Sequence, residues 1–330
     1  MSVRECPEPA SHGPGDGTRS ARAIAPAAIR RVGERLAPAT VHIDCSGVNF
    51  EKWQALGNDY VIVDAASLPF ELTPPRIRAI CAAHTGVFAD GIVVVSEPDE
   101  AGYLARLRIF NPDGSEAELS GNGAREAILY LRRRGWTDDD SFALQTAAGE
   151  IRPTITSPTT CTVEMGRARL RSADYPGGAP DGRGELVVRG RMWRFQHVQV
   201  GNPQCAIEIG SPDELAALDL QAFGPEIERN PLFPNRTNVS WFAVLEPGRI
   251  RARIFERGVG ETSASGTGAL GAAVSYALAG GRSPVTVVLD GGELEVEVSE
   301  HLKVNLSGPA VPVFRGALAD DFIEELHATE

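Results

Sequence analysis

Two short segments of the chain combine a serine with closely spaced glycines where a helix is expected to begin. The first is Ser-Gly-Asn-Gly-Ala at 120 to 124, and the second is Ser-Gly-Thr-Gly-Ala at 265 to 269. The first N–H groups of a helix have no intrahelical acceptor and carry partial positive charge. Glycine also lets a ligand approach the backbone closely. Each segment is therefore suited to bind a carboxylate.

Ser120 and Ser265 allow two interpretations. Serine is a good helix N-cap, and for one such segment alone this is the favoured interpretation. The recurrence with identical glycine placement instead favours one site in which two helix starts face each other across a carboxylate. The two serines would then flank the adjacent carbon, and the expected carboxylate-binding residues are Gly121, Asn122, Gly266 and Thr267.

The surrounding sequence predicts elements that give both segments the same context. β-Branched residues predict strands at 60–65, 91–96 and 105–111. One helix is expected between the first two strands, at 74–84. A second helix is expected after the third strand, at 122–135, with an apolar stripe of Ala127, Ile128 and Leu131. A second series of strands at 186–190, 194–201, 205–209, 237–245 and 250–258 precedes an alanine-rich helix at 265–281. An Asp-Gly turn predicts a hairpin at 284–300. The repeated order indicates duplication of a whole domain.

Composition excludes several classes of protein. The 330 residues carry a net charge of −12, which argues against a nucleic acid or an anionic membrane as partner. Five cysteines and six histidines are scattered without metal-ligand spacing, which indicates reduced thiols in a cytoplasm and no metal. The two lysines, Lys52 and Lys303, lack a phosphate-binding context, so pyridoxal phosphate is not expected. We expect no cofactor.

Dense motifs from about Phe50 to Phe314 resemble the diaminopimelate epimerase family. They are ALGNDYVIVD, HTGVFADGIVVV, RIFNPDGSEAELSGNGAR, VGNPQC, RTNV and ERGVGETSASGTGA. The resemblance implies an α+β fold of two pseudo-symmetric domains, each a mostly antiparallel sheet wrapped around a central helix. We expect one domain at 49–165 plus 311–330, the other at 166–310, and a disordered extension at 1–48.

The resemblance also implies a site. Family members use two cysteines, one as thiolate and one as thiol, on opposite faces of the substrate α-carbon, and these positions are Ser120 and Ser265 here. Gln204 occupies the position of a family histidine near the cysteines, and Phe88 occupies that of a family glycine. Glu126 directly follows the arginine of the first motif. Residues that grip the far end of an amino acid substrate match Asn58, Asn111, Asn202, Asn238, Glu256 and Arg257. Lysine biosynthesis and a homodimer are further implications.

The loss of both thiols argues against an unmodified two-base racemase. A serine hydroxyl is roughly five pKa units more basic than a thiol, on the order of 7 kcal/mol, whereas a helix dipole contributes about 1–2 kcal/mol. A serine base needs an activating partner. Laboratory replacement would explain the serines but not Gln204, Glu126 and Phe88, so natural divergence is the better interpretation.

Three functions remain open from the sequence. The first is one-sided proton removal leading to isomerisation, elimination or cyclisation, with Glu126, Glu118 or Glu256 as base. Glu126 is the weakest of these because its helical position is expected to face solvent. The second is a racemase or epimerase that still works, with Ser120, Ser265, Gln204 and Glu256 as catalytic residues. The third is an amino-acid-binding pseudoenzyme.

Overall fold

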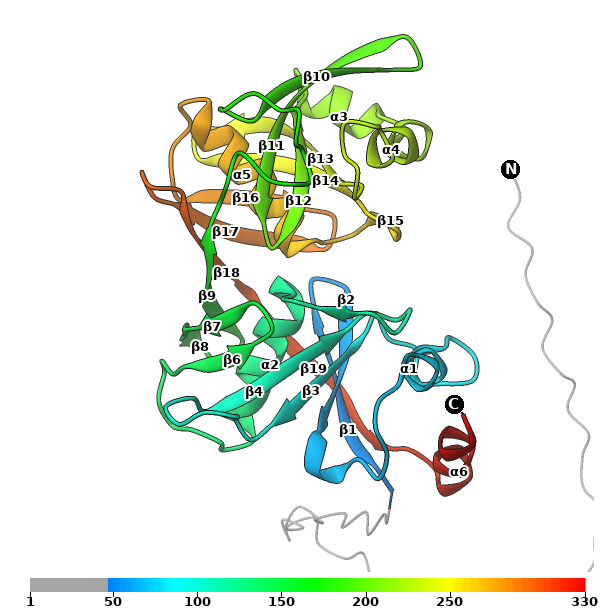
Figure 1. Ribbon diagram of the computed structural model, residues 1–330. Coiled ribbons are helices and arrows are strands. Elements are labelled where there is room, and N and C mark those ends of the chain that lie inside the picture. The colour runs from blue at the N-terminus through cyan, green and yellow to red at the C-terminus, as the bar shows by residue number, and fades with distance from the viewer. Residues whose placement is uncertain (1–46, 330) are drawn as a thin grey trace, which may run out of the picture. The chain divides into compact units, whose positions relative to one another are not determined.

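The computed structural model describes residues 47–329, which belong to one compact unit. All but the last two residues of the predicted disordered extension therefore lie outside the described part of the chain. Within it, strands form two sheets, and each sheet surrounds one long helix (Figure 1). The α+β prediction is confirmed.

The first sheet surrounds α2 (Gly121–Arg133). In spatial order its strands are β19 (Val311–Ala317), β1 (Asn49–Ala55), β2 (Asn58–Asp64), β3 (Ile92–Ser96), β4 (Ala105–Phe110), β6 (Leu144–Thr146) and β7 (Gly149–Ile151), with β5 (Glu116–Ala117) paired to β4. The strands at 60–65, 91–96 and 105–111 are confirmed with small differences at their ends. The sequence patterns missed β1 and its partner β19, which lies more than 250 residues later in the chain.

The second sheet surrounds α5 (Gly266–Leu278). In spatial order its strands are β10 (Arg183–Val188), β11 (Arg191–Val200), β12 (Asn202–Glu208), β13 (Asn238–Glu246), β14 (Arg249–Glu256), β16 (Val285–Leu289), β17 (Gly292–Val298), β18 (Lys303–Pro309), β9 (Thr160–Arg167) and β8 (Pro153–Ser157), with β15 (Gly260–Thr262) paired to β14. The predicted 284–300 hairpin is β16 and β17.

The two sheets repeat one pattern of strand pairing. In the first, β1–β2 is antiparallel, β2–β3 parallel, β3–β4 antiparallel and β4–β6 parallel. In the second, β11–β12, β12–β13, β13–β14 and β14–β16 follow the same sequence of orientations. The two halves are therefore pseudo-symmetric. The domain bounds stay a prediction. β8 lies before the predicted bound at 165 and β9 spans it, yet both pair within the second sheet.

Both central helices are buried almost all round. Eleven residues of α2 and ten of α5 are buried, including the predicted stripe residues Ala127, Ile128 and Leu131. A helix enclosed by a curved sheet buries its polar positions together with its apolar ones, so the apolar stripe of α2 underestimates how much of that helix is covered. One apolar cluster packs around both helices.

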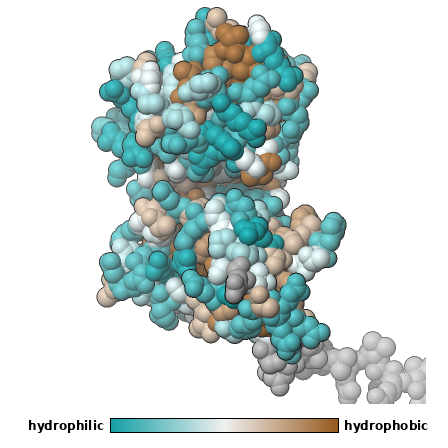
Figure 2. Space-filling model, turned by 45° about the vertical axis from the view of Figure 1, so that its right-hand side comes forward, coloured by the Kyte–Doolittle hydropathy of each residue, from teal (hydrophilic) through white to brown (hydrophobic). Residues whose placement is uncertain are grey.

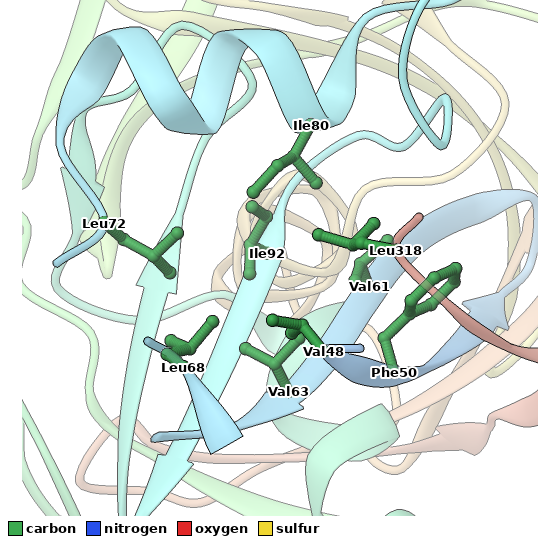
Figure 3. A pocket seen from close by; sticks show the side chains of 9 residues that line it. All are labelled: Val48, Phe50, Val61, Val63, Leu68, Leu72, Ile80, Ile92 and Leu318. Atoms are coloured by element: carbon green, nitrogen blue, oxygen red, sulfur yellow. The ribbon is translucent and has the colours of Figure 1, made fainter. Parts of the chain in front are cut away.

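Shorter helices cover the outer face of each sheet. In the first, α1 (Pro74–Cys81) and α6 (Asp320–Ala328) enclose an apolar layer, where a cavity of about 10 Å³ lies among side chains such as Val61, Ile80 and Leu318 (Figure 3). In the second, α3 (Pro212–Ala217) and α4 (Leu220–Glu228) pack on a layer that contains Trp193 and Trp241. Hydrophilic residues cover most of the face in Figure 2, as the net charge leads one to expect.

Candidate active site

Ser120 and Ser265 both line one cleft of about 940 Å³. Each serine is also the N-cap of its helix, because Ser120 Oγ accepts from the Gly123 N–H and Ser265 Oγ from the Gly268 N–H, both at 3.2 Å. The two interpretations of the serines are thus compatible in one structure. Capping fixes each hydroxyl oxygen at the start of its helix, where it faces the cleft.

The starts of α2 and α5 lie close together. A Cβ added at Gly121 would lie 3.5 Å from Gly266 Cα, and one added at Gly266 would lie 3.3 Å from Gly121 Cα. A Cβ at Gly121 would also lie 2.9 Å from Leu306 Cδ2, so a side chain there would force its neighbours to shift. The first N–H groups of both helices have no intrahelical acceptor, so two sets of donors lie beside one another, with Gly121, Asn122, Gly266 and Thr267 all lining the cleft.

Tyr60 of β2 is the partner of Ser120. Its hydroxyl donates to Ser120 Oγ at 3.2 Å, and burial raises the pKa of the phenol, so this side of the cleft carries neutral hydroxyls. Sequence patterns identified residue 60 only as part of a strand. Its equivalent in the second half of the repeat is Gln204, so comparing the two halves position by position would have drawn attention to it.

Glu256 is the partner of Ser265. It lies at the end of β14, is half-buried, and accepts a hydrogen bond from Thr262 Oγ1 at 2.9 Å. Burial raises the pKa of the Glu256 carboxyl, while hydrogen bonds from the Thr262 and Ser265 hydroxyls lower it. A carboxyl with a raised pKa next to Ser265 is suited to accept a proton near neutral pH.

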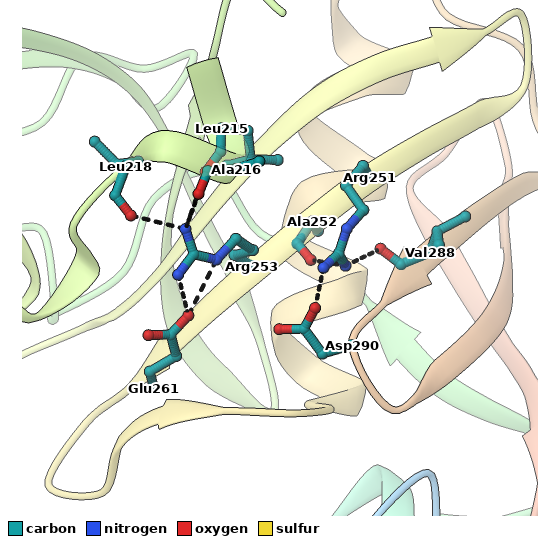
Figure 4. Close-up of polar contacts among 9 residues, drawn as sticks. All are labelled: Leu215, Ala216, Leu218, Arg251, Ala252, Arg253, Glu261, Val288 and Asp290. Carbon is teal, nitrogen blue, oxygen red and sulfur yellow. Dashed lines mark hydrogen bonds and ion pairs between the residues drawn. The ribbon is translucent and has the colours of Figure 1, made fainter. Parts of the chain in front are cut away.

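Two arginines of β14 fix the hairpin that carries Glu256 (Figure 4). Arg253 donates to Glu261 on β15 at 2.6 and 3.0 Å and also to the Leu215 and Leu218 carbonyls at the end of α3. Arg251 donates to the Val288 carbonyl of β16 at 2.9 Å and contacts Asp290. These contacts attach β14 and β15 to neighbouring elements, which positions Glu256 before any ligand binds.

The residues predicted to bind the far end of the substrate all line the same cleft. Its lining includes Asn58, Asn111, Asn202, Asn238, Glu256 and Arg257. Asn238 Oδ1 accepts from the Arg257 backbone N–H at 2.7 Å, and the buried Glu228 accepts from the Gly258 N–H at 3.0 Å. Arg257 itself is exposed and donates to the Asn235 carbonyl at 2.9 Å.

Asn58 and Asn122 connect the cleft wall to α2. Asn122 Nδ2 donates to Asn58 Oδ1 at 2.9 Å, and Asn58 Nδ2 donates to Asp90 Oδ2 at 2.8 Å. Asp90 lines the cleft and was not among the predicted site residues. These contacts give both asparagines a structural partner.

Three other predicted residues lie in different environments. Gln204 is buried and does not line the cleft; its Oε1 accepts from Ser240 Oγ at 3.4 Å, and its side chain lies against Gly271 of α5. The expectation that Glu126 faces solvent is wrong, because Glu126 is fully buried. Glu118 is exposed and lines the cleft.

Phe88 is exposed and its φ of +56° is in the left-handed region, a conformation that the family's glycine adopts without strain. The Lys52 ammonium lies 5.4 Å from the centre of its ring. Within residues 47–329, Cys81, Cys161 and Cys205 are free and buried, and no cluster of three potential metal ligands is found. None of the described helices combines the length and apolarity that crossing a membrane requires.

Comparison with known proteins shows which family this chain resembles. The family model described as diaminopimelate epimerase matches residues 50–171 and 196–313. A diaminopimelate epimerase of Synechococcus sp. (strain JA-3-3Ab) is 39% identical over 284 residues, covering 83% of this chain and 99% of the relative. One from Pelotomaculum thermopropionicum is 41% identical over 280 residues, covering 82% and 98%.

A solved structure shares the fold. A hydroxyproline epimerase from Agrobacterium vitis, with bound trans-4-hydroxy-L-proline, aligns with a TM-score of 0.61 at 13% identity, covering 83% of this chain and 93% of that one. The extent of the family match, together with the paired helix starts and the duplicated sheets, leads to one conclusion: the chain belongs to the diaminopimelate epimerase family.

Proposed function

We propose that this protein is a cofactor-independent isomerase that acts at the α-carbon of a small amino acid. The observation that carries the proposal is the close approach of the starts of α2 and α5, at Gly121 and Gly266, with one serine on each side. A carboxylate bound to both helix starts would hold its α-carbon between Ser120 and Ser265. Membership of an epimerase family supports this placement.

In this proposal the Glu256 carboxylate accepts the α-proton on the Ser265 side. The Cα–H bond breaks, the proton moves to Glu256, and the electron pair stays on the α-carbon and its carboxylate, which the helix starts stabilise. The Ser120 hydroxyl then gives its proton to the opposite face of the α-carbon and takes the Tyr60 proton in turn, which yields the epimer. Glu256 releases the abstracted proton to solvent in the cleft and Tyr60 regains one from that solvent, so no net proton is gained or lost. If a β-substituent leaves instead, the same electron pair forms a Cα=Cβ bond, which is the elimination alternative.

The polar lining far from the serines supports a substrate with a second polar end. Asn111, Asn202 and Asn238 supply neutral donors and acceptors there, and Arg257 supplies an exposed guanidinium suited to a carboxylate. Diaminopimelate fits this description and is the first substrate to test. Lysine biosynthesis, a cytoplasmic location and a homodimer stay predictions from the family resemblance.

A specific observation favours a second candidate, an amino-acid-binding protein without turnover. Both serine oxygens already accept N–H groups of their own helices, and burial raises the pKa of Tyr60. The Ser120 side therefore has no ionised base of the kind that a two-thiol epimerase has.

Exchange of the α-proton in deuterated water distinguishes the two. The protein is incubated with LL- and meso-diaminopimelate and with a panel of other amino acids, and loss of the α-proton signal is followed by NMR. Glu256→Gln is expected to slow exchange by about 10²–10⁴-fold. Glu118→Gln is the matched control, because Glu118 is an exposed carboxylate of the same cleft, and its exchange rate is expected to stay near that of the wild type.

Each result has a definite meaning. Equal exchange in the wild type and Glu256→Gln would refute the assignment of the base. Binding of an amino acid in calorimetry without exchange or product would replace the isomerase by the binding protein. Neither binding nor exchange with any amino acid would refute both candidates.

A further inference from the structure

Arg125 lies under the first turn of α2 and is fully buried. Its Nη1 donates to the Gly121 carbonyl and its Nη2 to Asn122 Oδ1, both at 2.9 Å. Gly121 and Asn122 are the two helix residues that supply the first N–H groups of the cleft. The guanidinium is therefore attached directly to the turn that the proposed carboxylate would contact.

The second half of the repeat lacks this charge. Counting from the two serines, Arg125 and Glu126 of α2 correspond to Leu270 and Gly271 of α5. Leu270 is buried in the apolar cluster around α5. The two helix starts are thus similar in backbone geometry but differ in electrostatics, and the difference lies behind the cleft surface.

The charge of Arg125 is poorly balanced by its surroundings. Arg125 takes part in none of the ion pairs formed by the described residues, and its Nε has no hydrogen-bond partner. Neighbouring Glu126 has two buried oxygens without a partner, and burial raises its pKa while Arg125 lowers it. Burial favours the neutral form of Glu126, which would leave the guanidinium as the positive charge below the helix start, and burial also lowers the pKa of Arg125 itself.

We propose that Arg125 is a positioning residue that makes the start of α2 the stronger of the two carboxylate-binding ends of the cleft. It does so by fixing the Gly121 carbonyl and the Asn122 side chain and by adding a buried positive charge to the dipole of α2. This inference rests on the proposed carboxylate site and deepens it: one substrate oxygen is held mainly by α2, and α5 completes the cradle.

A thiol placed at each serine measures the electrostatic potential there without any substrate. Ser120→Cys and Ser265→Cys are made separately, and every variant also carries Cys6→Ser and Cys45→Ser. The Ser265→Cys variant carries Glu256→Gln as well. The pH dependence of iodoacetamide alkylation gives each thiol pKa. Charged or titratable groups near the probes and Arg125 are Tyr60 on β2, Asp90 before β3, Glu126 on α2, Cys161 on β9 and Glu256 on β14.

The thiol of Ser120→Cys is expected to have a pKa lower than that of Ser265→Cys by about one unit or more. Adding Arg125→Met should raise it by a similar amount, whereas Arg125→Lys, which keeps a charge but not the forked hydrogen bonds, should retain most of the lowering. Arg125→Met should leave the thiol of Ser265→Cys nearly unchanged, which a general loosening of the protein would not do.

An unchanged thiol pKa in Ser120→Cys with Arg125→Met would overturn the inference. If Arg125→Met does not fold, the comparison of the two thiols decides: equal pKa values, or the reverse order, would also overturn it. Because these titrations involve no substrate, a failure here leaves the α-proton exchange result intact, and absence of exchange leaves the titrations intact.

Discussion

Replacing Glu126 with glutamine is expected to stabilise the protein, and increasingly so as the pH rises. Both Glu126 oxygens are buried and no hydrogen bond to them has standard geometry, and burial raises the pKa of this carboxyl while Arg125 and the nearby Tyr60 N–H lower it. The folded protein therefore holds the proton more tightly than the unfolded chain does. The stabilising effect of that proton is complete below the unfolded pKa and is lost as the pH rises through the folded pKa.

The magnitude follows from the unfolded reference. An unfolded glutamate has a pKa near 4.3, and each pH unit above it adds about 1.4 kcal/mol to the cost of keeping the carboxyl protonated. Between pH 5 and pH 7 the wild type is thus expected to lose up to about 3 kcal/mol of unfolding free energy relative to Glu126→Gln. Arg125 lowers the pKa of Glu126 and so limits the loss at high pH.

Urea denaturation of both proteins at pH 5, 6, 7 and 8 checks this prediction. Glu118→Gln serves as the control, because Glu118 is exposed and its replacement should change neither stability nor its pH dependence appreciably. A wild type that gains stability relative to Glu126→Gln as the pH rises would refute the reasoning. It would mean that Glu126 is ionised in the folded protein and paired with Arg125.

Three further predictions concern the fold and the cleft. Burial lowers the pKa of His197 to about 4, so the wild type should lose stability as the pH falls from about 6.5 towards 4, and urea denaturation of His197→Gln should lack that loss. Ser120→Ala and Ser265→Ala should each lower the unfolding free energy by about 1 kcal/mol, measured at pH 7, because each removes an N-cap. Gly121→Ala places a Cβ 2.9 Å from Leu306 Cδ2 and should lower the free energy of unfolding by about 1–3 kcal/mol and reduce α-proton exchange. Gly177→Ala is the control, because there is open space around Gly177, and it should change neither quantity.

Local patterns in the sequence predicted most elements near the cleft. The serine-glycine segments marked the starts of α2 and α5 because capping and close backbone approach need those residue types at those positions. Strand periodicity located β2, β3, β4, β13 and β14. Each of these signals depends on residues a few positions apart, which is why the sequence contains it.

Partners distant in the chain were decided by packing. The contact of Tyr60 with Ser120 spans 60 residues, and β1 pairs with β19 across more than 250. Gln204 was predicted beside the reacting atoms, yet its buried side chain lies against Gly271 of α5 and does not line the cleft.

The sequence by itself determined the family, the duplicated architecture and the two serines at the helix starts. Only the tertiary structure decided that Glu126 is buried and that Glu256 lies beside Ser265. The physical reason is that helical periodicity gives the direction of a side chain relative to its own axis but not what surrounds that axis. Because the sheet closes around α2, even the side expected to face solvent is enclosed, and Glu126 lies in the protein interior.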